Sequence, residues 1–181
     1  MAGEIDKLTG LLLEKSFQKR LEEEIQRARR YKVPVSLIVV EVNFDYYEKG
    51  KDLKKALSYT IYKQLSHLIK STIRVVDIAG RYGGEYFVIY LPETDIDGGI
   101  RTAERLRVAV ESHEFMGDEG NTRVKVAISA GVAAFAKHAI TSKELLSAAI
   151  KGLQVVKADG GNKVKECPIA INEELPSTQN N

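Results

Sequence analysis

The sequence predicts one α/β domain in which helices pack on a central mixed sheet. Two observations support this prediction. Four segments carry apolar residues at helical spacing, and short runs rich in β-branched residues alternate with them along the chain. The chain has 181 residues, 44% of them hydrophobic, which is sufficient to bury a sizeable core.

The first part of the chain predicts a helix, a strand and a second helix. Residues 14–31 form an amphipathic helical pattern, after which Pro34 precedes an apolar run over 35–42 that is typical of a buried strand. Helical spacing returns over residues 51–71. The apolar positions that define the two helices are Phe17, Leu21, Ile25, Ala28, Leu53, Leu57, Ile61, Leu65 and Leu68.

The middle of the chain predicts a β-hairpin. A strand over residues 74–80 and another over 85–92 flank the pair Gly83-Gly84. Glycine adopts positive φ at low cost, so this pair favours a tight turn between the two strands. Two further glycines are expected to permit close approaches of the backbone, Gly80 and Gly131.

The last part of the chain predicts two helices and two strands. A helix over residues 95–112 can be capped by Asp95, and a strand over 124–135 follows it. A further helix over 142–158 precedes a short strand over 162–167. We therefore expect a domain over residues 1–168 and a flexible C-terminal tail over 169–181.

Composition excludes several classes of protein. The chain carries 27 basic and 25 acidic residues, a net charge of +2, which gives no reason to expect a nucleic acid or an anionic membrane as partner. No apolar run approaches the ~18 residues of a membrane span. The first residues, MAGEIDKLTG, do not resemble a signal peptide, and the single cysteine, Cys167, suits a reducing compartment. We expect a cytoplasmic protein.

Five short motifs follow one another along the chain: DKLTGL (6–11), RYGGEYF (81–87), AERLR (103–107), VAISAGVA (126–133) and VKADGGN (156–162). In this order they resemble the motifs of the GGDEF family, the diguanylate cyclase domain of bacterial cyclic-di-GMP signalling. The resemblance covers residues 6 to about 165. It implies an α+β fold in which helices wrap a central, mostly antiparallel sheet, like the palm of nucleotide polymerases and cyclases.

The resemblance also implies a metal site. Joining two GTP molecules is phosphoryl transfer, which requires Mg²⁺ held by carboxylates. Glu41 and Glu85 stand at two of the family's metal-binding positions, whereas Asn43 and Tyr86 replace acidic residues. A phenol with a pKa of ~10 is a poor magnesium ligand and a poor base at neutral pH. The alternative is that Glu41 and Glu85 are ordinary polar residues at strand ends.

The family's substrate site is degraded in this sequence. Segment 46–59, YYEKGKDLKKALSY, lacks the Asn-Asp and Gly-His pairs with which the family reads the guanine of GTP. Lys157 matches a phosphate-binding lysine of the family, but Gly161 replaces its arginine companion and Ile150 replaces a nearby acid. What remains of the signature in this vestigial GTP site is Gly83, Gly84, Glu85 and Tyr86.

A second ligand site is retained. Arg74 and Asp77 form an R-x-x-D motif at the position of the family's product-inhibition site for cyclic-di-GMP, and Arg101 and Arg105 stand one helical turn apart in the following helix. Arginine offers a planar fork of donors to phosphate or guanine, and Asp77 can accept from the guanine N1 and N2 hydrogens. The alternative is structural: an Arg74–Asp77 surface pair, with the two helix arginines paired to Glu104 or Glu93.

The sequence therefore predicts a degenerate GGDEF domain, inactive as an efficient cyclase, that binds cyclic-di-GMP at Arg74, Asp77, Arg101 and Arg105 and acts as a receptor. Such a receptor needs no metal. We expect it to work as a homodimer or on a downstream protein partner. Two alternatives stay open: a weak diguanylate cyclase that uses GTP and Mg²⁺ with Glu41, Glu85 and Lys157, or an interaction module that binds no nucleotide.

Overall fold

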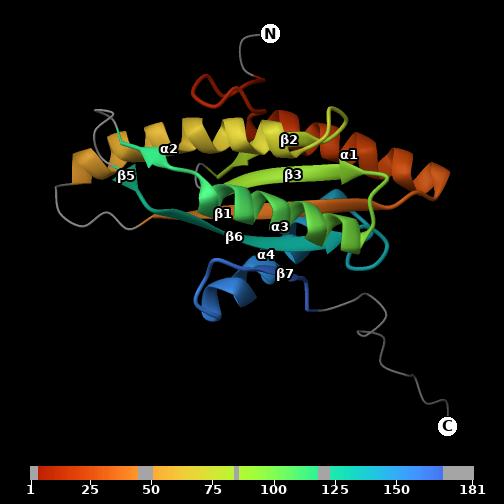
Figure 1. Ribbon diagram of the computed structural model, residues 1–181. Helices are drawn as coiled ribbons and strands as arrows, with labels where there is room; N and C mark the ends of the chain where they lie inside the picture. The colour runs from red at the N-terminus through yellow and green to blue at the C-terminus, as the bar shows by residue number, and fades with distance from the viewer. Residues whose placement is uncertain (1–3, 45–50, 84–85, 118–122, 169–181) are drawn as a thin grey trace.

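The computed structural model describes residues 4–44, 51–83, 86–117 and 123–168 (Figure 1). The predicted tail over 169–181 lies outside the described residues. In chain order the elements are α1 (Glu14–Tyr31), β1 (Val35–Phe44), α2 (Lys51–Thr72), β2 (Ile78–Tyr82), β3 (Tyr86–Pro92), α3 (Ile96–Ser112), β4 (Phe115–Met116), β5 (Arg123–Val124), β6 (Val126–Ala134), α4 (Ser142–Ala158) and β7 (Val164–Glu166).

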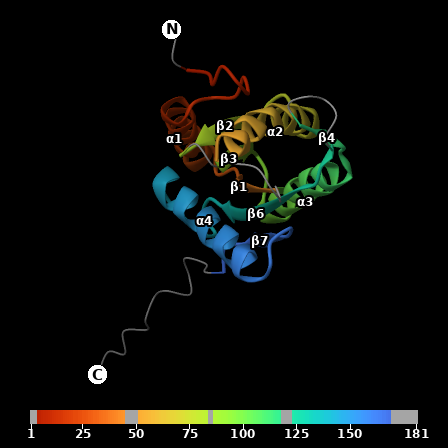
Figure 2. The ribbon, with the colours of Figure 1, turned by 90° about the vertical axis from the view of Figure 1, so that its left-hand side faces the viewer.

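The main sheet has five strands in the order β2-β3-β1-β6-β7. The pairs β2–β3, β3–β1 and β1–β6 are antiparallel, and β7 runs parallel to β6 after the crossover through α4. Figure 2 shows α1 and α4 on one side of this sheet and α2 and α3 on the other. The predicted fold class, a mostly antiparallel sheet wrapped by helices, is confirmed.

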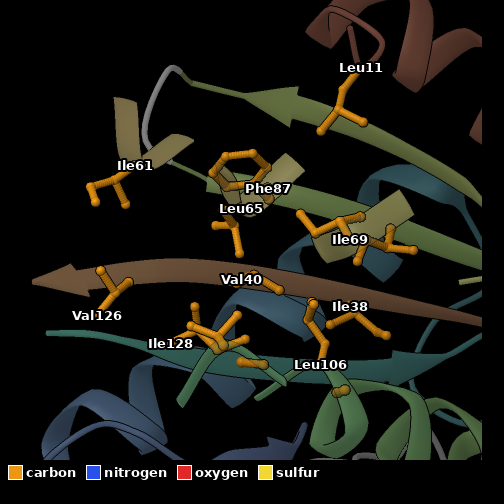
Figure 3. Close-up of a cluster of buried hydrophobic side chains, with 14 of the residues drawn as sticks. Leu11, Ile38, Val40, Ile61, Leu65, Ile69, Phe87, Leu106, Val126 and Ile128 are labelled. Atoms are coloured by element: carbon orange, nitrogen blue, oxygen red, sulfur yellow. The ribbon is translucent and has the colours of Figure 1, made fainter. Parts of the chain in front are cut away.

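Strand β1 supplies side chains to two separate cores, because successive residues of a strand point to opposite faces. Ile38 and Val40 face α2 and α3, where they pack with residues such as Leu65 and Leu106 (Figure 3). Leu37 and Val39 face α1 and α4 on the other side of the sheet. Burial on both faces is the reason that β1 is apolar along most of its length rather than alternating with polar residues.

The N-terminal segment extends the outer edge of the sheet. The backbone N–H of Leu12 donates to the carbonyl of Ala79, and the N–H of Arg81 donates to the carbonyl of Leu12. Before it, the Asp6 carboxylate accepts from the backbone N–H and the hydroxyl of Thr9, each at 2.8 Å. The motif DKLTGL is therefore a capped turn that leads the chain onto β2.

Two predicted features of the secondary structure need correction. Residues 74–77 are a turn, and strand β2 begins only at Ile78, because the Asp77 side chain accepts the N–H of Arg74 that a strand would offer to its neighbour. The short strands β4 and β5 pair with each other in a small second sheet, which the sequence did not predict. No helix of the described ranges is both long and apolar enough to cross a membrane.

Both predicted close approaches at glycine are confirmed. A Cβ at Gly131 would lie 2.0 Å from the carbonyl oxygen of Ala149 and 2.2 Å from the nitrogen of Leu153, so α4 rests directly on the backbone of β6. A Cβ at Gly80 would lie 2.7 Å from the ring of Phe17. Helix backbone cannot rotate away as a side chain can, which makes Gly131 the stricter requirement of the two.

We expect Gly131→Ala to lower the free energy of unfolding by about 3 kcal/mol, because α4 must move off the sheet to admit the methyl group. The control is Gly160→Ala, where φ is +89° but nothing lies within 4 Å of the added atom. That variant should cost only about 1 kcal/mol of backbone strain. Urea denaturation followed by circular dichroism measures both, and equal losses would contradict the close packing of α4 on β6.

Candidate functional site

The turn between α2 and β2 is held by Asp77. Its side chain is only 1% exposed, and its Oδ1 accepts from Arg74 Nη2 at 2.9 Å. Its Oδ2 accepts from the backbone N–H of Arg74 at 2.7 Å and from Arg74 Nε at 3.3 Å. These hydrogen bonds from Asp77 are the main cause of a raised pKa of Arg74. Both oxygens of Asp77 are thus used to orient one guanidinium.

The same guanidinium also contacts the segment after β3. Arg74 Nη2 donates to the carbonyl of Pro92 at 3.2 Å and to Thr94 Oγ1 at 2.8 Å. The side chain is nevertheless 54% exposed, and none of its hydrogen bonds to described residues involves Nη1. Arg74 is therefore fixed in orientation while one edge of its donor fork faces outward.

Three of the predicted ligand residues lie around one pocket of about 470 Å³, which we call the arginine pocket. Its lining residues are Pro34, Arg74, Glu93, Thr94, Asp95, Gly98, Arg101, Thr102 and Arg105. Arg105 donates to the carbonyl of Thr72 at the end of α2 at 2.7 Å. Arg101 is exposed on the preceding turn of α3. The predicted fourth ligand, Asp77, lies behind Arg74 and does not line the pocket.

The suggested structural pairing of the helix arginines does not occur in the described part of the chain. Glu104 pairs with Arg107, and Glu93 pairs with Arg27 of α1. Arg101 and Arg105 keep exposed side chains at the mouth of the arginine pocket. The pocket thus gathers three guanidinium groups against two carboxylates, Glu93 and Asp95.

Sequence reasoning named Glu93 only as a possible ion-pair partner and did not name Thr94; both residues follow β3 and line the arginine pocket. Glu93 adopts a left-handed backbone conformation with φ of 49°, an unusual choice for a residue other than glycine. The N–H of Thr94 donates to the carbonyl of Pro34 at 3.2 Å. No local sequence pattern signals these contacts, because they join segments that are far apart in the chain.

The opposite end of β1 carries Glu41, the predicted metal ligand. Its neighbours across the sheet are Tyr86 on β3 and Ser129 on β6. Glu41 Oε1 accepts from Lys157 Nζ of α4 at 2.8 Å, and the Glu41 side chain is 15% exposed. The other oxygen, Oε2, is buried and has no hydrogen bond in the described part of the chain. The sequence named both residues but did not predict that they pair.

The described residues do not fit a magnesium site. They contain no group of three His, Cys, Asp or Glu side chains that could hold a metal ion. Glu41 is already paired with the ammonium of Lys157, and Asn43 Oδ1 accepts from Ser129 Oγ at 3.1 Å. Of the signature, Gly83 has the expected positive φ, at 58°, while Gly84 and Glu85 lie outside the described residues.

A polar network joins α3 to this end of the sheet. Asn162, after α4, accepts from Arg107 at 3.3 Å and donates through Nδ2 to Glu111 at 2.9 Å. Its backbone N–H donates to Ser129 Oγ at 3.1 Å, and Ser129 in turn donates to Asn43. The hydrogen bond from Asn162, followed by that from Arg107, lowers the pKa of Glu111. Helix α3 therefore contacts the arginine pocket and the neighbourhood of Glu41.

These sites belong to a known class of domain. The family model described as "Diguanylate cyclase, GGDEF domain" matches residues 4–163. The chain therefore belongs to the GGDEF family, as the five motifs predicted. It is 32% identical over 160 residues to the response regulator PleD of Caulobacter vibrioides, a match that covers 88% of this chain and 35% of PleD. The chain thus spans about a third of the length of this relative.

Solved structures share the fold. The GGDEF domain of DgcB from Caulobacter crescentus, crystallised in complex with c-di-GMP, superposes with a TM-score of 0.79 at 22% identity, covering 93% of this chain and 96% of that one. The diguanylate cyclase SiaD from Pseudomonas aeruginosa, in complex with its activator SiaC, has a TM-score of 0.77 at 24% identity and covers 91% and 62%. At these identities the likeness establishes the fold.

We expect Lys157→Met to lower the free energy of unfolding by about 1–2 kcal/mol, because the largely buried Glu41 carboxylate loses its counter-charge. The double variant Glu41→Gln/Lys157→Met should recover most of this loss, since both charges are then gone. Denaturant unfolding of the four members of this double-mutant cycle measures the coupling energy.

The control for that cycle is Lys163→Met. Lys163 pairs with Asp159 at 2.7 Å, but both side chains are about half exposed. An exposed pair of this kind contributes at most about 0.5 kcal/mol. If Lys157→Met and Lys163→Met lower the free energy of unfolding equally, the Glu41–Lys157 ion pair stabilises the fold no more than an exposed pair does.

Proposed function

We propose that this chain is a GGDEF domain that binds cyclic-di-GMP in the arginine pocket and acts as a receptor, not as an efficient cyclase. The observation that carries the proposal is the convergence of Arg74, Arg101 and Arg105 on one pocket. Asp77 contributes by holding Arg74 in place. The arginine pocket offers three guanidinium groups to a ligand. The end of β1 that carries Glu41 does not offer a complete metal site among its described residues.

The chemistry of the pocket suits a dianionic dinucleotide. Guanidinium groups donate in pairs to phosphate oxygens or to the O6 and N7 acceptors of guanine. Arg74 is held in one plane by Asp77 and Thr94, so little freedom remains to be lost when a ligand binds. Arg101 and Arg105 are one helical turn apart and can contact the same ligand. DgcB, which shares the fold, was crystallised with c-di-GMP, which supports this choice of ligand.

The proposed absence of efficient cyclase activity is supported by the residues around Glu41, at the other end of β1. The ammonium of Lys157 neutralises Glu41, so a divalent cation would have to displace it. Tyr86 stands opposite Glu41 in the sheet, where the family's signature has a carboxylate. A weak Mg²⁺-dependent cyclase is the second candidate. The observation that favours it is the buried Oε2 of Glu41, which has no hydrogen bond to a described residue. In that case Glu85 would supply the second carboxylate.

A receptor must pass its signal to another molecule. We propose that the liganded chain acts as a homodimer or docks on a downstream protein. SiaD, a relative in fold, was crystallised with a protein activator, which supports a protein partner for domains of this shape. Helix α3 is suited to report the ligand, because it carries Arg101 and Arg105 and reaches Asn162 through Arg107.

We expect cyclic-di-GMP to bind in calorimetry with an affinity that falls at least tenfold in Arg74→Lys, because lysine keeps the charge but loses the planar fork. Arg101→Ala/Arg105→Ala should weaken binding further, by removal of two of the three cations. The control is Arg123→Ala, an exposed arginine paired with Glu114 away from the pocket. The receptor function would be refuted if cyclic-di-GMP gave no heat of binding with the wild-type protein and did not raise its melting temperature.

Incubation with GTP and either Mg²⁺ or Mn²⁺ should give no detectable cyclic-di-GMP by chromatography. An active GGDEF protein assayed in parallel shows that the conditions permit synthesis. Product that appears with the wild type and disappears in Glu85→Ala would establish the second candidate, the weak cyclase, in place of an inactive receptor.

A further inference from the structure

Another pocket, of about 530 Å³, lies between the C-terminal end of α1 and the loop that follows β6. We call it the α1 pocket. Its lining is mostly apolar and includes Val33, Pro34, Phe135 and Ile140, with Arg29 and Lys32 as its charged residues. No carboxylate lines it among the described residues. Ile140 is 55% exposed, and Tyr31 beside the pocket is 61% exposed. The described part of the chain thus leaves an apolar hollow with a basic rim uncovered.

The described part of the chain ends close to this pocket. Strand β7 runs parallel to β6, its last residue Glu166 pairs with Val132, and the Cys167 N–H donates to the carbonyl of Val132 at 2.8 Å. Both strands therefore run towards the loop over residues 135–141, where Lys137 Nζ donates to Glu166 at 3.0 Å. Cys167 packs in the core under α1 and α4, which is also the face of the sheet on which the α1 pocket lies.

The gap from the end of β7 to the α1 pocket is short. Val132, the partner of Glu166, also pairs with Ile38 of β1, four residues after Pro34 of the pocket lining. Two strand spacings of about 4.8 Å across the sheet and four residues of about 3.3 Å along it give roughly 16 Å from Glu166 to Pro34. Residues 167–175 span up to about 30 Å when extended, and can therefore cross this gap.

The segment that follows Pro168 has the composition that the α1 pocket would accept. Residues 169–175, IAINEEL, carry two isoleucines two residues apart, which is the spacing of one face of an extended chain. A pair of glutamates comes directly after them. Residues 176–181, PSTQNN, contain no charged and no large apolar residue. The predicted tail is thus divided into an apolar and acidic first part and a polar end.

The rim of the α1 pocket has no acidic partner of its own. Arg29 donates to the backbone carbonyl of Ile140, and neither Arg29 nor Lys32 forms an ion pair with a described residue. Arg30, next to them, is also exposed. Surface ion pairs contribute little free energy, so most of the stabilisation would come from burial of the isoleucines. The glutamates would instead fix the direction in which the segment lies.

We infer that residues 169–175 of this same chain bind in the α1 pocket, with the two isoleucines on its apolar lining and the two glutamates near Arg29 and Lys32. The segment acts as a strap that holds the loop over 135–141 against the C-terminal end of α1. Because β7 delivers the segment next to the pocket, its effective concentration there is high, and weak contacts suffice. The inference does not depend on the proposed function.

The first test is limited proteolysis of the full chain with Glu-C, a protease that cleaves after glutamate and would cut after Glu173 and Glu174. Cleavage of a segment that opens and closes quickly follows the population of its open form. We expect wild type to be cut in the tail about tenfold more slowly than Ile169→Ser/Ile171→Ser, as measured by intact mass. The control Thr178→Ala/Gln179→Ala should be cut like wild type.

Two further measurements remove trivial causes. Synthetic peptides of residues 168–181 with each sequence give the intrinsic cleavage rate, by which the rate of each full chain is divided. Melting temperatures show that each variant is folded. Equal normalised rates for wild type and Ile169→Ser/Ile171→Ser would overturn the strap.

Exchange of charges tests the place where the segment binds. Lys32→Glu puts a negative charge on the rim and should speed tail cleavage, whereas Glu174→Lys in the same chain should restore slow cleavage at Glu173. The control is Lys19→Glu, the same charge change on an exposed residue of α1 that does not line the pocket. An equal effect of Lys19→Glu, or no restoration by Glu174→Lys, would contradict binding in the α1 pocket.

Dilution separates the strap from an exchange between two chains. Slow cleavage that persists on dilution, with the mass of a monomer in light scattering, is expected for a segment bound to its own chain. Slow cleavage that is lost on dilution, together with the mass of a dimer, would place the segment in the pocket of a second copy and overturn the intramolecular strap.

Discussion

Burial of β1 on both of its faces is the constraint on which the rest of the molecule depends. The strand lies at the centre of the sheet between β3 and β6, and its alternate side chains enter two different cores. Every helix therefore packs on a surface that β1 helps to build. The two ends of the strand are the places where buried apolar residues give way to polar ones, and both candidate sites lie there.

The distance between these ends allows the residues of one candidate site to change without effect on the other. Pro34 borders the arginine pocket and Glu41 lies seven residues further along, roughly 23 Å at about 3.3 Å per residue. Substitutions that far apart act independently when they share no partners. The replacements near Glu41 therefore need not disturb Arg74. Helix α3 contacts both regions through Arg105 and Arg107, and strand β3 runs between them from Tyr86 to Pro92.

The parts that could be predicted from the sequence are those encoded locally. The apolar run of β1, the helical spacing of α1 and the cap at Asp95 each depend on neighbours within a few residues, and all are confirmed. The turn at residues 74–77 was predicted as a strand because its two valines favour β-structure, yet Val75 is fully exposed and Asp77 closes the turn. The hydrogen bond from the Arg74 N–H to the Asp77 side chain therefore outweighed the β-propensity of the two valines.

The sites themselves depend on contacts that no local pattern contains. Glu41 and Lys157 are 116 residues apart, and Arg27 and Glu93 are 66 apart. Family motifs identify such residues singly, but not which partner neutralises each charge. The partner sets the chemistry of each group: a carboxylate next to an ammonium is a poor site for a cation, whereas Arg74 is oriented by Asp77 and has no hydrogen bond through Nη1 to a described residue. The two candidate sites thus differ in how their charged groups are paired, and not only in which residues they contain.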